Sequence, residues 1–332
     1  MELPTYVQLE PVGQCNLRCQ MCPIQFRNDG PEGGTPAFMS FDLFRRVIDQ
    51  FDSLEHLHLQ GLGEPMLHPR FFDMIEYAVA KGIRVTTNTN LTVLSPLRAE
   101  RCVSSGIDRL HISVDAATLE TYARIRVRSR LERVSRNLGF LKEAREKAGS
   151  LRPDLRLVMV IMRQNLEELP DIVRLAHNWG CSSIFVQHLC HDFEEDTLPE
   201  RYRSMRRFVD DQSLLSEDPG RITEYFHAAR ELADGLGIEL RLPRTQVRAH
   251  PPGTPGPERC SWPWRGIYAS YQGFSMPCCM ISTPDRLNFG NLSDVSARDV
   301  WNSPSYNDFR AQLAADRPPD ICRSCAVYRG VF

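Results

Sequence analysis

The sequence predicts an α/β fold, namely a partial (β/α)6 TIM-like barrel followed by a small cysteine-rich C-terminal module. Three observations support this prediction. Short β-like runs alternate with helical patterns over residues 1–242, which is typical of a parallel sheet covered by helices. Glycine-rich or polar motifs follow several of these runs, and a proline- and glycine-rich segment at 243–258 precedes widely spaced cysteines. We therefore expect a barrel at 1–242, a linker at 243–258 and a module at 259–332.

Six strand–helix units make up the expected barrel. Its strands are predicted at residues 6–10, 56–60, 83–87, 109–114, 155–161 and 183–187, with a further strand at 238–242. The first helix is expected at 40–51 with Ser40 as its N-cap, and the second ends before Gly82, which suits the left-handed backbone after a helix. His56 and His58 alternate with leucines, and we interpret them as core or interface histidines. In barrels of this kind the chemistry lies at the carboxyl ends of the strands.

The first strand leads into the segment VGQCNLRCQMCP, in which Cys15, Cys19 and Cys22 have C-x3-C-x2-C spacing. Thiolates select zinc, copper(I) or iron–sulfur clusters. A structural zinc site needs four ligands and a cubane cluster has four irons, so three cysteines leave one metal position open. Catalytic metal sites keep one coordination position open for a water molecule or a substrate. We interpret the loop as the ligand set of a [4Fe–4S] cluster, and the alternative is a zinc knuckle completed by a distant Cys or His.

This cysteine motif resembles that of the radical S-adenosylmethionine (SAM) enzymes, in which the amino and carboxylate groups of SAM chelate the fourth iron. The resemblance implies a SAM-binding [4Fe–4S] cluster. The run Gly61-Leu62-Gly63-Glu64-Pro65 resembles the GGEP motif of the family, with Leu62 extra or displaced, and would bind the SAM amino group. Small residues let the backbone approach a ligand, and a carboxylate can accept hydrogen bonds from an ammonium group. A tight turn with a solvated glutamate is the alternative.

The same resemblance points to further contacts with SAM. Asn88 and Ser113, at the ends of the third and fourth strands, match positions that contact SAM in relatives, although each could instead be a helix cap. Arg126 stands apart from five neighbouring arginines that suit a solvated helix face, because its surroundings look like those of an arginine near the SAM carboxylate in related enzymes. Gln187 is preferred by position as a ligand over His188, which is a candidate catalytic residue that could touch adenine or substrate, although a lone histidine is more often structural.

Four cysteines beyond the linker form a second expected site: Cys260, Cys278, Cys322 and Cys325. An apparent hairpin around Gln272-Gly273 separates the first two, and four thiolates would fully ligate one cluster. This pattern resembles the SPASM/twitch modules of radical SAM enzymes, which implies an auxiliary [4Fe–4S] cluster. The one-cluster twitch form fits better, because the later cysteines of a full SPASM domain are missing. A zinc ribbon is the alternative, and Cys279 is a spare thiol and a candidate catalytic residue.

The resemblance covers nearly the whole chain and implies a radical SAM oxidoreductase. As in twitch-bearing aminocyclitol dehydrogenases, a substrate radical would lose a proton and pass an electron to the auxiliary cluster. Because the chain starts at the first strand, without room for an N-terminal peptide-recognition domain, we favour a small polar substrate such as a sugar or aminocyclitol. An epimerase or a ribosomal-peptide maturase is the alternative. A non-enzymatic iron–sulfur electron carrier is the alternative of a different class.

Composition limits the partners that we expect. The formal net charge is −2, from 40 basic and 42 acidic residues, which disfavours recognition of nucleic acid or an anionic membrane by bulk charge. No apolar run approaches the ~18 residues of a spanning helix, and the first ten residues do not resemble a signal peptide. We therefore expect a cytoplasmic protein whose eleven cysteines are ligands or buried thiols, with an external electron donor such as flavodoxin or ferredoxin.

Overall fold

The computed structural model describes residues 1–30, 37–189, 193–248, 250–251, 253–315 and 317–331. Within these residues, nine strands form one sheet in the order β7-β6-β5-β4-β3-β2-β1-β8-β9. The first seven are parallel, each paired with its sequence neighbour, as the alternating pattern predicts. They are β1 (Tyr6–Leu9), β2 (His56–Leu59), β3 (Arg84–Thr89), β4 (Arg109–Ser113), β5 (Asp154–Ile161), β6 (Ser183–His188) and β7 (Glu239–Arg241).

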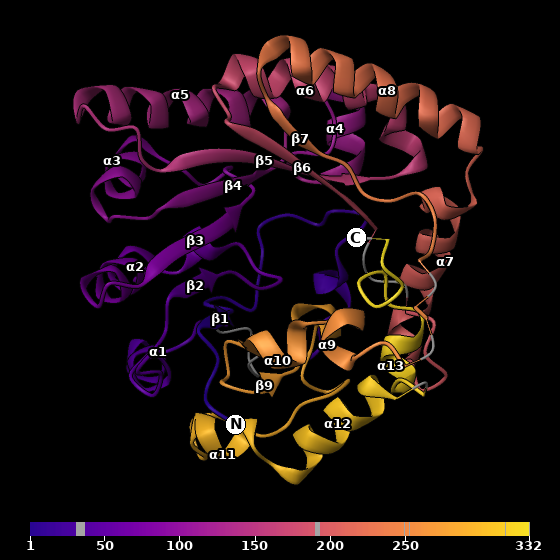
Figure 1. Cartoon of the computed structure of the whole chain (residues 1–332). Helices are drawn as coiled ribbons and strands as arrows, with labels where there is room; N and C mark the ends of the chain where they lie inside the picture. Colours follow the sequence, from indigo (N-terminus) through magenta and orange to yellow (C-terminus); the bar gives the residue numbers. More distant parts are fainter. Residues whose placement is uncertain (31–36, 190–192, 249, 252, 316, 332) are drawn as a thin grey trace.

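Helices cover the outer face of this curved, unclosed sheet, so the expected partial barrel is confirmed (Figure 1). They are α1 (Phe41–Ile48), α2 (Phe71–Ala80), α3 (Pro96–Ser104), α4 (Leu119–Ile125), α5 (Leu131–Lys147), α6 (Leu169–Trp179) and α8 (Pro219–Leu236). Helix α7 (Arg203–Gln212) lies apart from them and packs on the first cysteine loop through Met205 and Val209. The Ser40 hydroxyl accepts a hydrogen bond from the Leu43 amide and caps α1, as predicted. Gly82 has a φ of +80° just after α2. Among the described residues, no helix is long and apolar enough to cross a membrane.

The strands of the barrel have one apolar and one polar face. Leu57 and Leu59 of β2 are fully buried in the core under the helices. His56 and His58 alternate with them and share the Thr86 hydroxyl of β3, at 2.8 and 2.7 Å. Both histidines line a cavity on the inner face of the sheet, so the interpretation as core or interface residues was wrong. The inner face is polar because the barrel encloses a lumen.

The C-terminal module continues the barrel sheet. Strand β8 (Gly266–Ala269) pairs in parallel with β1, and β9 (Ser275–Met276) pairs antiparallel with β8, which confirms the hairpin expected around Gln272-Gly273. The helices of the module are α9 (Gly256–Arg259), α10 (Trp262–Arg265), α11 (Ala297–Trp301), α12 (Pro304–Ala314) and α13 (Asp320–Arg323). Trp301 and Tyr306 are fully buried in the same hydrophobic core as β1. The two parts therefore pack as one body.

The expected linker at 243–258 overlaps the module, since α9 begins at Gly256. Residues 249 and 252 of that segment lie outside the described part of the chain. The backbone amides of Arg244 and Arg248 donate hydrogen bonds to the carbonyls of Val331 and Arg329. The segment is therefore fastened to the C-terminal residues.

Candidate active site

The first three cysteines lie in one cavity at the carboxyl ends of the strands. Cys15, Cys19 and Cys22 line a space of about 210 Å³. Backbone hydrogen bonds fix their loop against the end of α4, since the amides of Arg18 and Gln20 donate to the carbonyls of residues 127 and 125. Burial raises the pKa of the Cys15 and Cys22 thiols to about 12. A bound cluster would instead hold them as thiolates, because a metal deprotonates the thiol that coordinates it.

The structure brings all seven predicted SAM-binding residues to this same cavity. They come from the ends of four different strands and from the residue that ends α4. They are Gly61, Gly63, Glu64, Asn88, Ser113, Arg126 and Gln187. Within the described residues, no group of three or more His, Cys, Asp or Glu side chains is arranged to hold a single metal ion. A [4Fe–4S] cluster with SAM is larger than a single ion. Three thiols could bind its irons, and the polar groups around them could bind SAM.

The loop after β2 packs tightly on the cysteine loop, and this contact requires its glycines. A Cβ atom on Gly63 would lie 2.0 Å from the Val12 carbonyl oxygen, and one on Gly61 would lie 2.3 Å from Cγ of Glu10. The Glu64 amide also donates to the Gln14 carbonyl at 3.0 Å. The G-x-G run therefore lets one backbone approach the other.

Glu64 connects three segments of the cavity wall. Its carboxylate accepts hydrogen bonds from the Thr89 hydroxyl at 2.7 Å, the Asn90 amide at 2.8 Å and the Met66 amide at 3.2 Å. The side chain is 2% exposed, and burial raises its pKa despite these bonds. The solvated turn is thus excluded, and the carboxylate is held by these three bonds in the wall of the cavity. Its contact with the SAM amino group stays a prediction.

Strand β3 supplies polar groups that sequence reasoning only partly identified. It runs to Thr89, two residues beyond the predicted end. Asn88 lines the cavity, and its buried Oδ1 has no hydrogen-bond partner among the described residues, so it can accept from a ligand hydroxyl or amine. Asn90, which was missed, donates to Asn16 Oδ1 at 3.2 Å and lies 3.7 Å from the Cys15 sulfur. The run Asn88-Thr89-Asn90 after a strand was the available signal.

Arg126 places a buried positive charge beside the cysteines. Its Nε donates to Asp115 Oδ2 at 2.5 Å and its Nη1 lies 3.9 Å from the Cys19 sulfur. Burial lowers the pKa of Arg126, but the Asp115 carboxylate, Cys19 and Tyr122 together raise it above its usual value. Asp115 is fully buried and also accepts from the Val160 amide at 2.8 Å. Sequence reasoning missed Asp115 because its partner lies eleven residues away, past a helix.

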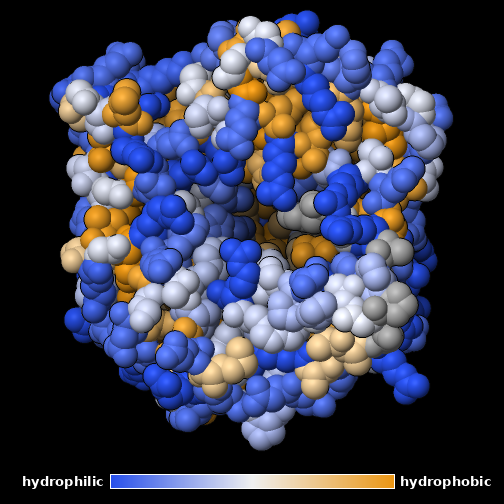
Figure 2. All heavy atoms as spheres, in the orientation of Figure 1, coloured by the Kyte–Doolittle hydropathy of each residue, from blue (hydrophilic) through white to orange (hydrophobic). Residues whose placement is uncertain are grey.

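A second cavity of about 520 Å³ fills the lumen below the first. The two share part of their lining, including Gln60, Asn88 and Gln187, so they are joined. Cys279 lines the lumen. The face shown in Figure 2 is hollowed between the barrel and the module, and mostly hydrophilic residues surround the opening. His188 lines neither cavity: it is 3% exposed and its Nε2 lies 2.6 Å from the Arg244 carbonyl oxygen.

The four C-terminal cysteines also converge. Burial raises the pKa of the Cys278 thiol well above its usual value, and four nearby thiols raise it further: Cys279, Cys325, Cys260 and Cys322. Such mutual effects require the sulfurs to lie close together. The set fits a four-thiolate cluster that leaves no iron for an exchangeable ligand. Its role as a ligand set stays a prediction, as does that of the first three cysteines.

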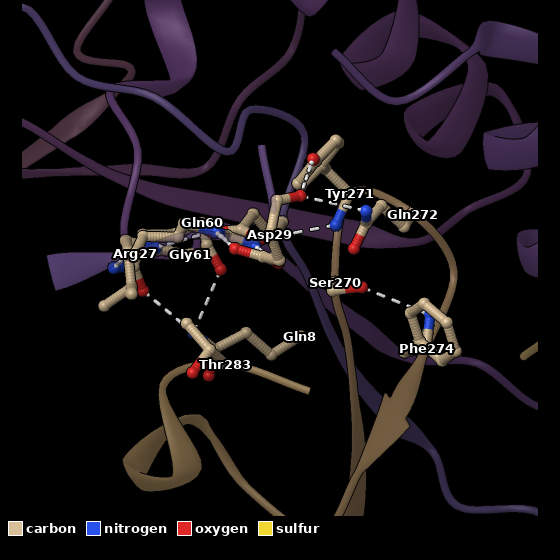
Figure 3. Close-up of polar contacts among 12 residues, drawn as sticks. Gln8, Arg27, Asp29, Gln60, Gly61, Ser270, Tyr271, Gln272, Phe274 and Thr283 are labelled. Atoms are coloured by element: carbon tan, nitrogen blue, oxygen red, sulfur yellow. Dashed lines mark hydrogen bonds and ion pairs between the residues drawn. The ribbon is translucent and has the colours of Figure 1, made fainter. Parts of the chain in front are cut away.

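Glu10 joins the two cysteine sites through a buried network. Its carboxylate accepts from Arg27 Nη1 at 2.7 Å, from the Leu62 amide at 3.0 Å and from the Tyr271 amide at 3.3 Å. Arg27 pairs with Asp29, and the Asp29 carbonyl accepts from the Tyr271 hydroxyl at 2.6 Å. Figure 3 shows Arg27, Asp29 and Gly61 beside the turn between β8 and β9. The module thereby contacts the segment that follows the first cysteine loop.

Comparisons with known proteins agree with this geometry. Residues 9–176 match the model of the radical SAM superfamily, and residues 260–326 match SPASM, an iron-sulfur cluster-binding domain. The tungsten-containing aldehyde ferredoxin oxidoreductase cofactor-modifying protein of Pyrococcus furiosus is 26% identical over 92% of this chain and 83% of its own length. The PqqA peptide cyclase of Xanthomonas euvesicatoria is 27% identical over 97% and 80%. The structure of Streptococcus suis SuiB bound to the precursor peptide SuiA aligns with a TM-score of 0.69 at 15% identity, over 99% of this chain and 71% of SuiB.

Proposed function

Because this chain belongs to the radical SAM superfamily and carries a SPASM iron–sulfur domain, we propose that it is a maturase that modifies a peptide substrate. One observation carries the proposal: a lumen of about 520 Å³ opens into the cavity that holds the cysteine loop. A relative that is similar over 97% of the chain is named a peptide cyclase. This proposal replaces the sugar or aminocyclitol that the sequence suggested. The small substrate was expected because the chain starts at the first strand. The position of the first residue does not determine what the lumen can bind.

Each part of the site has a task in this proposal. Cys15, Cys19 and Cys22 would hold a [4Fe–4S] cluster, which would supply the electron for reductive cleavage of SAM and so start radical chemistry on the substrate. Asn88 and Gln187 line both cavities, so they can orient SAM toward the lumen. Glu64 holds the loops after β2 and β3 together, which keeps the site preorganised.

The C-terminal quartet would hold the auxiliary cluster beside the lumen. Cys278 belongs to this quartet, and its neighbour Cys279 lines the lumen wall. A redox group in that position suits the removal of an electron from a substrate held in the lumen. A purely electron-carrying protein would have no need of the joined cavities.

The proposal can be tested with the reduced, reconstituted protein. It is incubated with SAM and the short peptides encoded beside its gene, and with sugars and aminocyclitols in parallel. We expect release of 5′-deoxyadenosine together with a change in peptide mass, both absent in the Cys15/Cys19/Cys22→Ala variant. Oxidation of a sugar with every peptide unchanged would contradict the maturase. Absence of 5′-deoxyadenosine under strong reduction would favour the electron carrier.

A further inference from the structure

The amino-terminal half of the lumen is lined by four arginines, which we call the cationic floor: Arg84, Arg109, Arg156 and Arg241. Arg84 and Arg109 begin β3 and β4. Arg156 is the third residue of β5, and Arg241 lies in register with Phe185 of β6. Three neighbouring strands, β3, β4 and β5, and the edge strand β7 therefore direct cationic side chains into one space. None of them lines the cavity of the first cysteine loop.

Positive charge on this floor exceeds the nearby negative charge. Among the described residues that line the lumen, Asp108 is the only acidic one, and it pairs with Arg152. Arg109 pairs with Asp154 at 2.6 Å. Arg156 donates to the Ser183 hydroxyl at 2.8 Å, while the Glu239 carboxylate lies 3.8 Å away.

The other two arginines are open to a ligand. Within the described residues, Arg84 and Arg241 have no ion pair, and the Arg241 guanidinium lies over the Phe185 ring at 4.7 Å. Burial lowers the pKa of Arg156, and the neighbouring Arg109 lowers it further. Burial likewise lowers the pKa of His111 to about 2, and His58 and Arg156 contribute. A bound anion would offset this mutual repulsion of cations.

The rest of the lumen sets the shape and length of the ligand. Tyr6, Trp262 and Tyr268 supply aromatic rings to its lining, and the first two meet edge to face at 5.5 Å. Asn88, where the lumen joins the upper cavity, lies four residues along β3 from Arg84. At about 3.3 Å per strand residue, this separation is about 13 Å. A ligand that reacts at the top and is held on the floor must span about four extended residues.

We propose that the lumen binds an acidic peptide segment, with one carboxylate on the cationic floor about 13 Å from the carbon that reacts beside the upper cavity. The proposal rests on the proposed function and names the substrate class of the same site. Arginine suits this role because its planar guanidinium binds carboxylates through paired hydrogen bonds. A single sugar or aminocyclitol would not span the distance.

A pool of capped hexapeptides tests the charge preference. One position carries Glu in half of the pool and Gln in the other half, and that position varies along the chain. The reconstituted full-length protein with SAM is incubated with the pool, and the bound peptides are separated by ultrafiltration and counted by mass spectrometry. We expect wild type to retain Glu peptides over Gln peptides by about tenfold or more, since hydrogen bonds to charged groups are the strong ones.

Two variants assign that preference to the floor. In the Arg84→Gln/Arg241→Gln double variant, which removes the two arginines that have no ion pair with a described residue, the ratio of Glu to Gln peptides should fall close to one. Arg133→Gln on the exposed side of α5 removes one positive charge elsewhere and should keep the wild-type ratio. Iron content and circular dichroism show whether each variant is folded. Equal retention of Glu and Gln peptides by wild type, or an unchanged ratio in the double variant, would overturn the proposal.

Small dicarboxylate probes distinguish a failure of the cationic floor from a failure of the proposed peptide-modifying function. Glutarate carries carboxylates without a peptide, and glutaramide is its neutral counterpart. Suppose that glutarate binds wild type but not the double variant, and that no peptide is retained. This result would support a carboxylate site on the cationic floor and would contradict a peptide substrate. If peptides are retained without charge preference and glutarate does not bind, the result would support the peptide-modifying function and would contradict a carboxylate site on the cationic floor.

Discussion

The chain builds its two cysteine sites in different ways. Cys15, Cys19 and Cys22 belong to one loop of eight residues, and the walls of their cavity come from the ends of other strands. The C-terminal quartet is assembled from a hairpin and a distant C-x2-C pair. The first site leaves space for a ligand, whereas the second has enough thiolates to complete a cluster. We propose that the first is the reactive site and the second a supporting redox site, and five predictions test this difference.

The largest expected effect comes from removing either set of ligands. Wild type should hold about eight irons in two cubane clusters after anaerobic reconstitution. Replacing Cys15, Cys19 and Cys22 by Ala should leave about four irons and abolish SAM cleavage. Replacing Cys322 and Cys325 by Ala should also leave about four, but the protein should still release 5′-deoxyadenosine. A content of about four irons per chain in wild type, or tightly bound zinc, would contradict the presence of two iron–sulfur clusters.

The network that joins the two sites should matter next. In Glu10→Gln, Arg27 loses its fully buried carboxylate partner. Breaking a buried ion pair by removing one partner costs about 3–5 kcal/mol when the other charge is left alone, and we expect a smaller cost here because Arg27 keeps its pair with Asp29. We expect a lower thermal unfolding midpoint, and earlier proteolysis between barrel and module. Glu100→Gln is the matched control, because its pair with Lys147 is exposed, and it should leave the midpoint unchanged. Equal midpoints for both variants would show that Glu10 does not couple the sites.

Glu64 should determine the shape of the first cavity. Glu64→Ala removes the acceptor for Thr89 and Asn90, and each charge-assisted bond contributes about 1.5–3 kcal/mol. The loop after β3 should lose its fixed position, so SAM affinity should fall roughly tenfold to a hundredfold. Iron content should change less, because the cysteines remain. Equilibrium binding of SAM measures the effect. Unchanged SAM affinity would show that Glu64 is not needed to shape the cavity.

The lumen between the two sites should make stability depend on pH. Burial lowers the pKa of His56 and His58 to about 4 and that of His111 to about 2. The unfolded chain, with histidine pKa values near 6.5, therefore binds more protons below pH 6.5. Stability should be full above pH 6.5 and fall as the pH drops toward 4, by about 1.4 kcal/mol per pH unit for each histidine.

His111→Asn should reduce that slope by about one proton. His227→Asn is the control, since His227 lies exposed on α8 and should leave the slope unchanged. Denaturation followed between pH 5 and 7 provides the measurement. A slope that is the same in wild type and His111→Asn would place the pH dependence outside the lumen.

Cys279 should give the smallest effect, although it lies where lumen and quartet meet. We expect it to be a packing residue beside the auxiliary cluster, so Cys279→Ala should retain substrate turnover. In deuterium oxide the wild-type product should carry no deuterium on carbon. A product of unchanged formula with one carbon-bound deuterium, lost in the variant, would instead identify an epimerase with Cys279 as its hydrogen donor.

Local patterns in the sequence were sufficient to predict the alternating strands of the barrel and part of the lining of the upper cavity, including Glu64 and Arg126. Parallel strands place their carboxyl ends at one edge, so motifs that follow strands must meet there. Glu64 shows the limit of this reasoning. Its place after β2 was correct, but its partners Thr89 and Asn90 belong to the next strand. A motif fixes where a residue lies along the chain, whereas contacts between loops decide which groups it bonds.

By itself, the sequence determined the alternating fold, the two cysteine sets and the family, because these depend on periodicity and short spacing. Only the tertiary structure decided that His56 and His58 face a lumen, that Arg84 and Arg241 share it, and that Glu10 reaches the Tyr271 amide. The physical reason is that a strand of alternating polar and apolar residues has two faces. The pattern separates these faces but does not say which of them encloses a cavity.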